Sequence, residues 1–344
     1  SSADRIEPDC RTTGPTGDSV RIPGCVYDHC NYDAEIAIKQ AQLLEFIRYM
    51  PNANEAEILP PAKSPKQLHY RNKLILHTHS KRGSVKLGYL EEKSHRVLDI
   101  PECPLSCVEI NEKLHAIRSS GQFKKLPDKA TVTLRYTKDD GILWWINRPS
   151  QRSWITEESA IGKLRVSSDG FFQVNPAVSQ ALTKTVMDWF HEEPTEHILD
   201  LYCGAGLFGL ACRQAGGIHL TGVESGKRAI LAARHNATKI GIKADFLVRE
   251  LGKAELNLQQ LTKDPLQTTC IVDPPRSGMD KSVIRTLAAS RIPRLFYISC
   301  NPSTLQRDLK MLITEGDYRI KRIQLFDMFP RTAHFEAICE LTGK

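Results

Sequence analysis

The stretch ILDLYCGAGLFG, residues 198–209, decides the fold of this chain. It joins a short apolar run to Gly204, Gly206 and Gly209, in the spacing G-x-G-x-x-G. Glycines at this spacing let the backbone approach a ligand closely where a helix follows a strand. Glu224 ends the next apolar run about twenty residues later, where a carboxylate can accept hydrogen bonds from both hydroxyls of a ribose. The stretch therefore predicts a cofactor site at the carboxyl edge of a parallel sheet.

Two cofactors fit such a turn, a dinucleotide or S-adenosylmethionine. Asp200 stands directly before the glycines. Its carboxylate would repel a pyrophosphate, yet it could face the ammonium group of a methionine moiety. We therefore favour S-adenosylmethionine.

Apolar runs alternate with helical stretches from residue 166 to the end of the chain. We predict strands at residues 198–202, 220–224, 246–248, 270–273 and 295–299, and helices at residues 177–190, 206–214, 226–240, 281–290 and 305–315. Alternation of this kind predicts a doubly wound, Rossmann-like α/β sheet. Residues 318–327 and 334–341 follow each other with no helix between them and should form a closing antiparallel pair.

The front of the chain has a different pattern. Short alternating runs at residues 73–79, 85–89, 131–136 and 142–146 predict antiparallel strands, with one helix from Val108 onward. Residues 33–50 should form a helix that ends at Pro51 and packs on the catalytic domain. The first thirty residues are rich in Gly and Pro and are expected to form a loop. A chain of 344 residues has room for two domains. We place them at residues 1–165, smaller and strand-rich, and 166–344, the Rossmann-like domain.

The composition is that of an ordinary globular protein, with 41% hydrophobic and 25% charged residues. No run reaches the roughly 18 apolar residues needed to span a bilayer, so we expect no membrane partner and a cytoplasmic location. The net charge of +7 favours a polyanionic partner, because Lys and Arg make most contacts to phosphate.

Two further turns carry reactive side chains to the same edge of the predicted sheet. VDPPRSG, residues 272–278, is a rigid turn that holds Asp273. SCNPSTLQRD, residues 299–308, places Cys300 just past an apolar run and before a helix, whose positive end favours a thiolate. Glu336 opens the last strand. A lone cysteine is usually a core residue, and a lone glutamate usually lies on the surface; their shared place in the fold favours a catalytic role.

Together these motifs resemble the RNA uracil-5-methyltransferases that carry an iron-sulfur cluster. The resemblance covers FFQVNP (171–176), DLYCGAG (200–206), DPPR (273–276), SCNPSTLQRD (299–308) and FPRTAHFE (329–336). It implies that Cys300 adds to carbon 6 of uracil, and that Glu336 removes the carbon-5 proton after methyl transfer. The cofactor contacts are implied to be Gln173, Tyr202, Gly204, Gly206, Glu224 and Asp273.

The same resemblance implies a 4Fe-4S cluster held by Cys10, Cys25, Cys30 and Cys103, with Cys107 as an alternative to Cys103. Thiolates suit zinc as well as iron-sulfur clusters, so the choice of iron depends on the resemblance. We expect a structural role for the cluster, because methyl transfer moves no net electrons.

The expected substrate is a uridine in structured RNA, 23S rRNA in the first place and tRNA as the alternative, bound by a monomer. A flipped base could stack on Phe171 or Phe172. Two other classes stay open: a methyltransferase that acts on cytosine or adenine, and a non-catalytic RNA-binding protein on the same fold. The presence of both Cys300 and Glu336 argues against the last.

Overall fold

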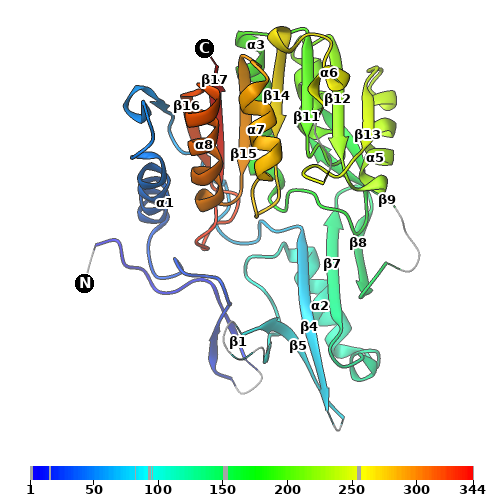
Figure 1. Cartoon of the computed structure of the whole chain (residues 1–344). Helices are drawn as coiled ribbons and strands as arrows, with labels where there is room; N and C mark the ends of the chain where they lie inside the picture. The colour runs from blue at the N-terminus through cyan, green and yellow to red at the C-terminus, as the bar shows by residue number, and fades with distance from the viewer. Residues whose placement is uncertain are drawn as a thin grey trace.

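The computed structural model describes residues 3–14, 17–81, 83–91, 94, 96–149, 154–253 and 257–343. Its main sheet is built from β3 (Glu57–Ile58), β11 (His197–Leu201), β12 (His219–Glu224), β13 (Asp245–Val248), β14 (Thr268–Val272), β15 (Arg294–Ser299), β16 (Arg319–Phe326) and β17 (Glu336–Thr342). The strand order is β13-β12-β11-β14-β15-β17-β16-β3 (Figure 1). The first five strands of this order are parallel, and β17 runs antiparallel to both of its neighbours. The predicted α/β sheet with its closing antiparallel pair is confirmed.

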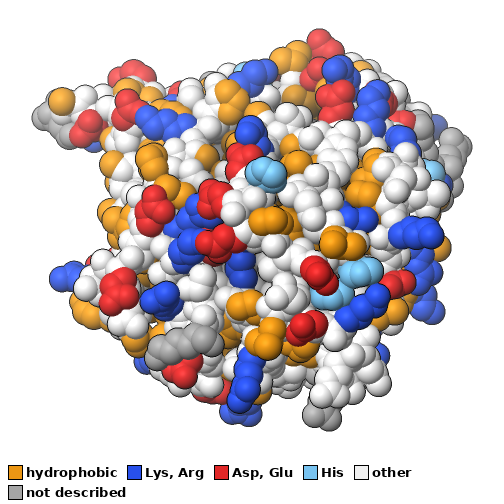
Figure 2. Space-filling model, turned by 90° about the horizontal axis from the view of Figure 1, so that it is seen from above, with side chains coloured by type: hydrophobic (Ala, Val, Ile, Leu, Met, Phe, Trp, Pro, Cys, Tyr) orange, Lys and Arg blue, Asp and Glu red, His pale blue; other side chains and the backbone are white. Residues whose placement is uncertain are grey.

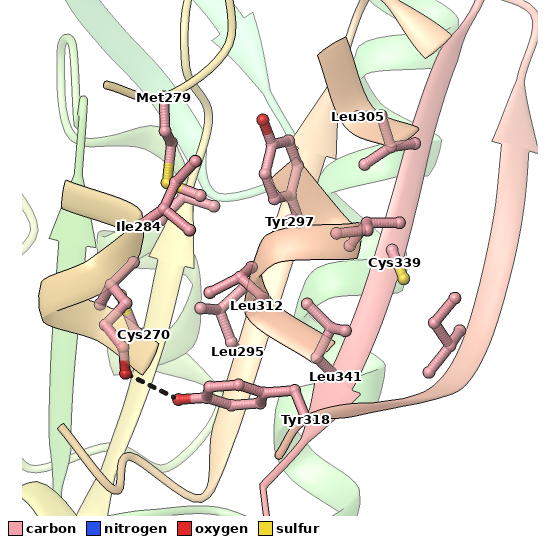
Figure 3. Packing of buried hydrophobic residues seen from close by; sticks show 14 of the residues in the cluster. Cys270, Met279, Ile284, Leu295, Tyr297, Leu305, Leu312, Tyr318, Cys339 and Leu341 are labelled. Carbon is pink, nitrogen blue, oxygen red and sulfur yellow. Dashed lines mark hydrogen bonds between the residues drawn. The ribbon is translucent and has the colours of Figure 1, made fainter. Parts of the chain in front are cut away.

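Helices cover both faces of this sheet. One face carries α3 (Pro176–Glu192), α4 (Leu207–Gln214) and α5 (Lys227–Lys239); the other carries α1 (Tyr32–Ile47), α6 (Leu258–Leu261), α7 (Lys281–Ala289) and α8 (Pro302–Gly316). Ile284, Leu295 and Leu312 interlock in the second layer (Figure 3), beside Tyr318, whose hydroxyl donates to the Ile292 carbonyl at 2.8 Å. Two apolar layers of this kind are what a doubly wound sheet requires.

A smaller antiparallel sheet lies against one end of the main sheet. It contains β4 (Lys73–Lys81), β5 (Ser84–Leu90), β6 (Val97–Asp99), β7 (Thr131–Thr137) and β8 (Gly141–Ile146), in the order β6-β5-β4-β7-β8, with α2 (Val108–Ser119) packed on it. The carboxyl ends of the parallel strands point toward this sheet (Figure 1). The predicted strands and helix of the front part are confirmed. None of the helices in the described ranges is both long and apolar enough to cross a membrane.

Several elements were not expected from the sequence. The first thirty residues contain a short hairpin, β1 (Arg11–Thr13) with β2 (Ser19–Arg21), where only a loop was predicted. A second hairpin joins β9 (Trp154–Ser159) to β10 (Gly162–Ser167), and it buries Ile155, Leu164 and Val166 in the core shared with α3 to α5. The short strands β3 and β6 and the four-residue helix α6 were not predicted either. All of these elements are short, so the spacing of their apolar residues does not reveal them.

A buried ion cluster ties the end of β17 to its neighbours. The Glu340 side chain is fully buried, and it accepts from the Nε of Arg294 at 2.6 Å and from the Nε of Arg322. Arg294 also donates to the Glu193 carbonyl at 2.6 Å. Each buried charge therefore has an opposite charge or a carbonyl beside it, which is the condition under which such a cluster is tolerated.

We predict that Glu340→Gln lowers the free energy of unfolding by roughly 3 to 5 kcal/mol, because it leaves the buried guanidinium of Arg294 without a counter-charge, whereas Arg322 keeps its ion pair with Glu192 at 2.6 Å. Urea unfolding followed by circular dichroism measures the change. Asp188→Asn is the control: it breaks the exposed pair of Lys184 and Asp188 (3.0 Å) and should cost less than about 1 kcal/mol. Equal losses in the two variants would contradict the prediction.

Candidate active site

The glycine turn after β11 leaves open space for a ligand. Gly204 and Gly206 have φ of 53° and 88°, in the left-handed region that favours glycine. A Cβ atom added at Gly204 would meet nothing within 4 Å, whereas one at Gly209 would stand 2.7 Å from Asp200 Oδ2. Gly204 thus leaves room at the edge of the sheet, and Gly209 permits the close approach of α4 to β11.

Glu224 joins the glycine turn to the turn after β12. Its Oε1 accepts from the amide of Gly226 at 2.7 Å and from the hydroxyl of Ser225 at 3.0 Å, while Oε2 accepts from the Gly204 amide at 3.4 Å. The carboxylate remains partly exposed. The carboxylate is therefore placed to accept hydrogen bonds from the hydroxyls of a ribose that lies across both turns.

Asp200 is turned into the fold rather than toward a ligand. Its side chain is buried, Oδ2 accepts from the Gly209 amide at 2.9 Å, and Oδ1 has no partner among the described residues. Burial raises the pKa of Asp200 to about 8, and the charges of Asp273 and Glu224 add to the rise. We expected this carboxylate to face the ammonium of a methionine moiety. That expectation was wrong, because the side chain points into the protein beneath α4.

The pairing of β15 with β17 brings together the two residues assigned to catalysis. Ser299 lies opposite Ala337, so the same register continued by one residue sets Cys300 opposite Glu336. Directly opposed residues of an antiparallel pair have Cα atoms about 4.5 to 5.5 Å apart. Cys300 is half-buried and Glu336 is buried.

The turn that carries Asp273 is fastened to the Cys300 turn. Asn301 caps α8 and donates through Nδ2 to the Arg276 carbonyl at 2.9 Å, and the Thr304 hydroxyl donates to the same carbonyl at 3.3 Å. Asp273 is partly accessible at this edge, yet the protein packed around its carboxyl raises the pKa to about 7. The structure thus brings Cys300, Glu336 and Asp273 into one site.

Burial dominates the electrostatics of this site. It raises the pKa of Cys300 to about 11, and the charges of Glu336 and Asp273 add to the rise. Burial and Asp273 also hold the pKa of Glu336 well above its usual range. Arg276 lowers the pKa of both groups. Arg276 belongs to the DPPR motif, whose pattern did not predict a role for this residue. A site with clustered buried carboxyl groups is favourable for a cationic ligand such as a sulfonium.

Gln173 lies in the loop before α3, and its side chain is buried. In the same loop Asn175 donates to the Met328 carbonyl at 3.4 Å, which holds the loop beside the connection that leads to Glu336. Of the two neighbouring aromatic residues, Phe171 is 77% exposed and Phe172 only 9%. Phe171 is therefore the ring that could stack on a base, and Phe172 belongs to the core.

Tyr202 follows β11 with a φ of 63°. Burial raises the pKa of its hydroxyl to about 12, and that hydroxyl is close to Asp280 at the start of α7. The side chain is therefore directed toward α7, at the border of the glycine turn, and only its backbone lies within the turn itself.

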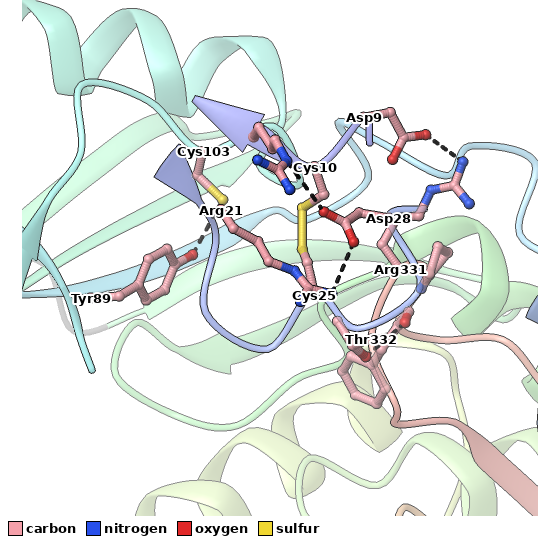
Figure 4. Close-up of a disulfide and its surroundings, with 12 residues drawn as sticks. Asp9, Cys10, Arg21, Cys25, Asp28, Tyr89, Cys103, Arg331 and Thr332 are labelled. Atoms are coloured by element: carbon pink, nitrogen blue, oxygen red, sulfur yellow. Dashed lines mark hydrogen bonds and ion pairs between the residues drawn. A yellow bond between two sulfur atoms is a disulfide. The ribbon is translucent and has the colours of Figure 1, made fainter. Parts of the chain in front are cut away.

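The cysteines of the front part do not form the predicted metal site in this arrangement. Cys10 and Cys25 are joined as a disulfide (Figure 4), whereas Cys30 and Cys103 are buried free thiols and Cys107 is a partly exposed one. Within the described ranges no three His, Cys, Asp or Glu side chains are grouped as metal ligands. The predicted site is not formed because the disulfide sulfurs of Cys10 and Cys25 are not thiolates and cannot bind a metal as such.

The surroundings of these cysteines nevertheless suit a negatively charged group. Cys103 lies beside the disulfide, with its sulfur 3.2 Å from the Tyr89 hydroxyl (Figure 4). The buried guanidinium of Arg71 interacts with Cys103, and its Nε has no hydrogen-bond partner among the described residues. An unsatisfied buried donor of this kind favours an anionic neighbour. The cysteine sulfurs and the Arg71 guanidinium are chemically suited to a thiolate-bound cluster. The disulfide between Cys10 and Cys25 is not compatible with such a cluster.

The opposite end of the main sheet presents paired charges (Figure 2). Acidic and basic side chains are interspersed over this face. A hollow of about 330 Å³ there is lined by Glu55, Glu193, Arg319, Ile320, Lys321 and Thr342. Lys321 already bonds Glu193 at 3.2 Å. The hollow is therefore a weaker candidate than the carboxyl edge, where the predicted catalytic residues meet.

Known proteins are similar to this chain in both sequence and fold. The family model described as tRNA (uracil-5-)-methyltransferase matches residues 154–343. A 23S rRNA (uracil(1939)-C(5))-methyltransferase of Acidithiobacillus ferrooxidans is 30% identical over 97% of this chain and 83% of its own length. A tRNA (uracil(54)-C(5))-methyltransferase of Schizosaccharomyces pombe is 30% identical over 93% of this chain and 63% of its own length.

Among solved structures, the tRNA (uracil-54, C5)-methyltransferase of Pyrococcus abyssi in complex with S-adenosyl-L-homocysteine has a TM-score of 0.72. It is 25% identical in sequence, and the match covers 99% of this chain and 94% of that one. The fold is therefore that of an S-adenosylmethionine-dependent methyltransferase, as predicted. The chain belongs to the tRNA (uracil-5-)-methyltransferase family and is an RNA uracil-5-methyltransferase.

Proposed function

We propose that the protein methylates carbon 5 of one uridine in 23S rRNA through a transient covalent bond from Cys300. The observation that carries this proposal is that β15 and β17 pair as far as Ser299 and Ala337, which brings the neighbouring residues Cys300 and Glu336 together at the carboxyl edge of the sheet. A nucleophile and a base on opposite sides of one small space are what addition to a flat ring followed by proton removal requires.

The chemistry divides between the two residues. When bound, S-adenosylmethionine supplies an electrophilic methyl group on its sulfonium. The Cys300 thiolate adds to carbon 6 of the uracil, and the electron pair of the 5,6 double bond makes carbon 5 the nucleophile that takes this methyl. The Glu336 carboxylate then removes the proton from carbon 5. The electrons left behind restore the double bond and expel the Cys300 thiolate.

The cofactor residues that we propose have separate tasks. The open space at Gly204 and the left-handed turn at Gly206 admit the ligand, and the Glu224 carboxylate accepts its ribose hydroxyls. The charge of Asp273 acts on Glu336, and its carboxylate can orient the methyl donor. Gln173, in the loop before α3, and Tyr202, at the end of β11, are proposed as further contacts to the cofactor.

Two relatives bear on the choice of RNA. The match to the rRNA enzyme of Acidithiobacillus ferrooxidans covers 83% of that protein, whereas the match to the yeast tRNA enzyme covers 63%. Of these two relatives at 30% identity, the rRNA enzyme is covered over the larger share of its length, so we favour 23S rRNA. The tRNA enzyme of Pyrococcus abyssi, covered to 94% at 25% identity, makes tRNA the second candidate. Incubation with unmodified transcripts of both RNAs and nucleoside analysis decides between them: 5-methyluridine in tRNA alone would overturn the choice.

We also propose that the protein works as a monomer in the cytoplasm. Cys300, Glu336 and Glu224 all come from one chain, so catalysis needs no second copy. A nucleophilic thiol requires reducing conditions, which favours the cytoplasm. The same conditions would open the bond between Cys10 and Cys25 and free both sulfurs.

Cys10, Cys25, Cys30 and Cys103 would then hold a 4Fe-4S cluster. Their burial and the unpaired Nε of Arg71 support this proposal. No step of methyl transfer passes through the cluster, whose role is to fasten the front segment.

The first prediction concerns the covalent intermediate. Glu336→Gln should accumulate a denaturation-resistant adduct with methylated RNA, because the carbon-5 proton cannot leave without the base. Methyl incorporation and denaturing gels with labelled S-adenosylmethionine measure it. Cys300→Ala should lose both adduct and product, whereas Cys107→Ala, which changes a free thiol of the front part, should behave as wild type. Product formation by Cys300→Ala would exclude the covalent route.

The second prediction concerns pH. Because the reactive form of Cys300 is the thiolate and burial raises its pKa to about 11, kcat/KM should rise with pH throughout the neutral range. The expected rise is roughly tenfold per pH unit between about pH 7 and pH 9. Deprotonation of Glu336, whose pKa is also raised, acts in the same direction.

Arg276→Gln should move this rising limb to higher pH by about one unit, because the Arg276 charge lowers the pKa of both reacting groups. Arg285→Gln is the control, since Arg285 is an exposed arginine on α7 that pairs with Glu315 at 3.7 Å. A profile of Arg276→Gln that overlays the wild type would show that this charge does not act on the reacting groups.

The third prediction concerns the cluster. Anaerobic reconstitution with ferrous iron and sulfide should load roughly four iron atoms per chain and give broad absorbance in the blue. Cys103→Ser should lose most of this iron, whereas Cys107→Ser should retain it. Zinc bound in place of iron, or retention of the Cys10 to Cys25 disulfide under reducing anaerobic conditions, would refute the cluster.

A further inference from the structure

A lysine of α1 is fully buried and bonded to the segment that precedes Glu336. The side chain of Lys39 has no exposed surface. Its Nζ donates to Glu35 Oε1 at 2.7 Å, to Asp327 Oδ1 at 2.6 Å and to the Phe329 carbonyl at 3.2 Å. An ammonium group has three donors, and all three are used here.

Two more residues of the same helix hold the same segment. The Glu35 carboxylate accepts from the Arg331 amide at 2.7 Å and from its guanidinium at 3.2 Å. The Tyr32 hydroxyl donates to Asp327 Oδ2 at 2.8 Å. Residues 32, 35 and 39 are spaced to share one face of a helix. Three side chains on this face of α1 therefore hold residues 327–331 through hydrogen bonds and ion pairs.

The segment that α1 holds leads directly to Glu336, the proposed base. Residues 327–335 connect β16 to β17, and Glu336 is the first residue of β17, where the ladder with β16 ends at the pair of Phe326 and Glu336. The segment contains no helix or strand. The position of the Glu336 carboxylate therefore depends on how the segment approaches the sheet.

Docking of α1 alone does not require this cluster. Leu43 and Ile47 of the same helix already pack in the apolar core with α7 and α8. Buried ion pairs contribute little net stability, because desolvation offsets their attraction, but they fix geometry. The cluster is thus better suited to set the path of a segment than to hold the helix in place.

We propose that Lys39 is a positioning residue for the methyl transfer reaction, which fixes residues 327–335 so that the Glu336 carboxylate reaches the carbon-5 proton. The proposal rests on the function of Cys300 and Glu336 proposed above. Cys300 is held separately, through the bond from Asn301 to the Arg276 carbonyl. Loss of the Lys39 contacts should therefore slow proton removal while addition of the thiolate continues.

The test is Lys39→Met in the full chain, assayed with labelled S-adenosylmethionine and the RNA that the wild type methylates. We expect kcat to fall on the order of tenfold to a hundredfold with little change in KM, and the methylated covalent adduct to accumulate as it does in Glu336→Gln. Glu340→Gln is the matched control, since it breaks a buried ion cluster on the same strand far from the base. It should lose stability without accumulating adduct.

A folded Lys39→Met variant with wild-type turnover and no adduct would overturn the proposal. Should Lys39→Met not fold, Tyr32→Phe replaces it, since it removes one hydroxyl from the cluster and keeps the ring. A lowered kcat with adduct in Tyr32→Phe supports the proposal, and wild-type behaviour overturns it. If Glu336→Gln itself forms no adduct, the proposed function fails, and that result is separate from a failure of Lys39 alone.

Discussion

The pairing of β15 with β17 is the constraint on which the site depends. Parallel strands alone would bring Asp273 and Cys300 to the same edge, because both residues follow the ends of strands. The first residue of a further parallel strand, however, would lie at the opposite edge. Because β17 enters the sheet antiparallel between β15 and β16, its first residue lies where β15 ends. Glu336 therefore lies beside Cys300 at this edge, one residue beyond the last pair of the two strands, Ser299 with Ala337.

This arrangement places acidic groups close together in a poorly solvated space. Burial leaves the carboxyl groups of Asp200 and Asp273 with pKa values of about 8 and about 7, and it holds that of Glu336 well above its usual range. Arg276 offsets part of this effect. A bound sulfonium would add a second positive charge and lower these pKa values further. Cofactor binding would thus help to ionise Glu336, the base that we propose.

Local patterns predicted most of the fold, because short stretches of sequence reveal strand ends and glycine turns. The catalytic roles of Cys300 and Glu336 came from the resemblance to the family and stay predictions. The sequence predicted that Cys300 and Asp273 share one edge, since both follow apolar runs. It could not predict the contact of Lys39 with Asp327, which lie 288 residues apart and belong to no periodic pattern. It also misplaced the Asp200 carboxyl, because side-chain direction at a strand end depends on the helix above. The hairpin of β9 and β10 was missed because it is short and charged.

The front segment and the connection to the base form one structural unit. Cys25 pairs with Thr332, and the amides of Val26 and Tyr27 both donate to the Arg331 carbonyl, at 2.9 and 3.2 Å. Arg331 in turn is bound by Glu35 of α1. Anything that holds Cys25 in place, whether a disulfide or a cluster, therefore restrains the chain that leads to Glu336. Methyl transfer moves no net electrons, so this restraint is the role that we propose for these cysteines.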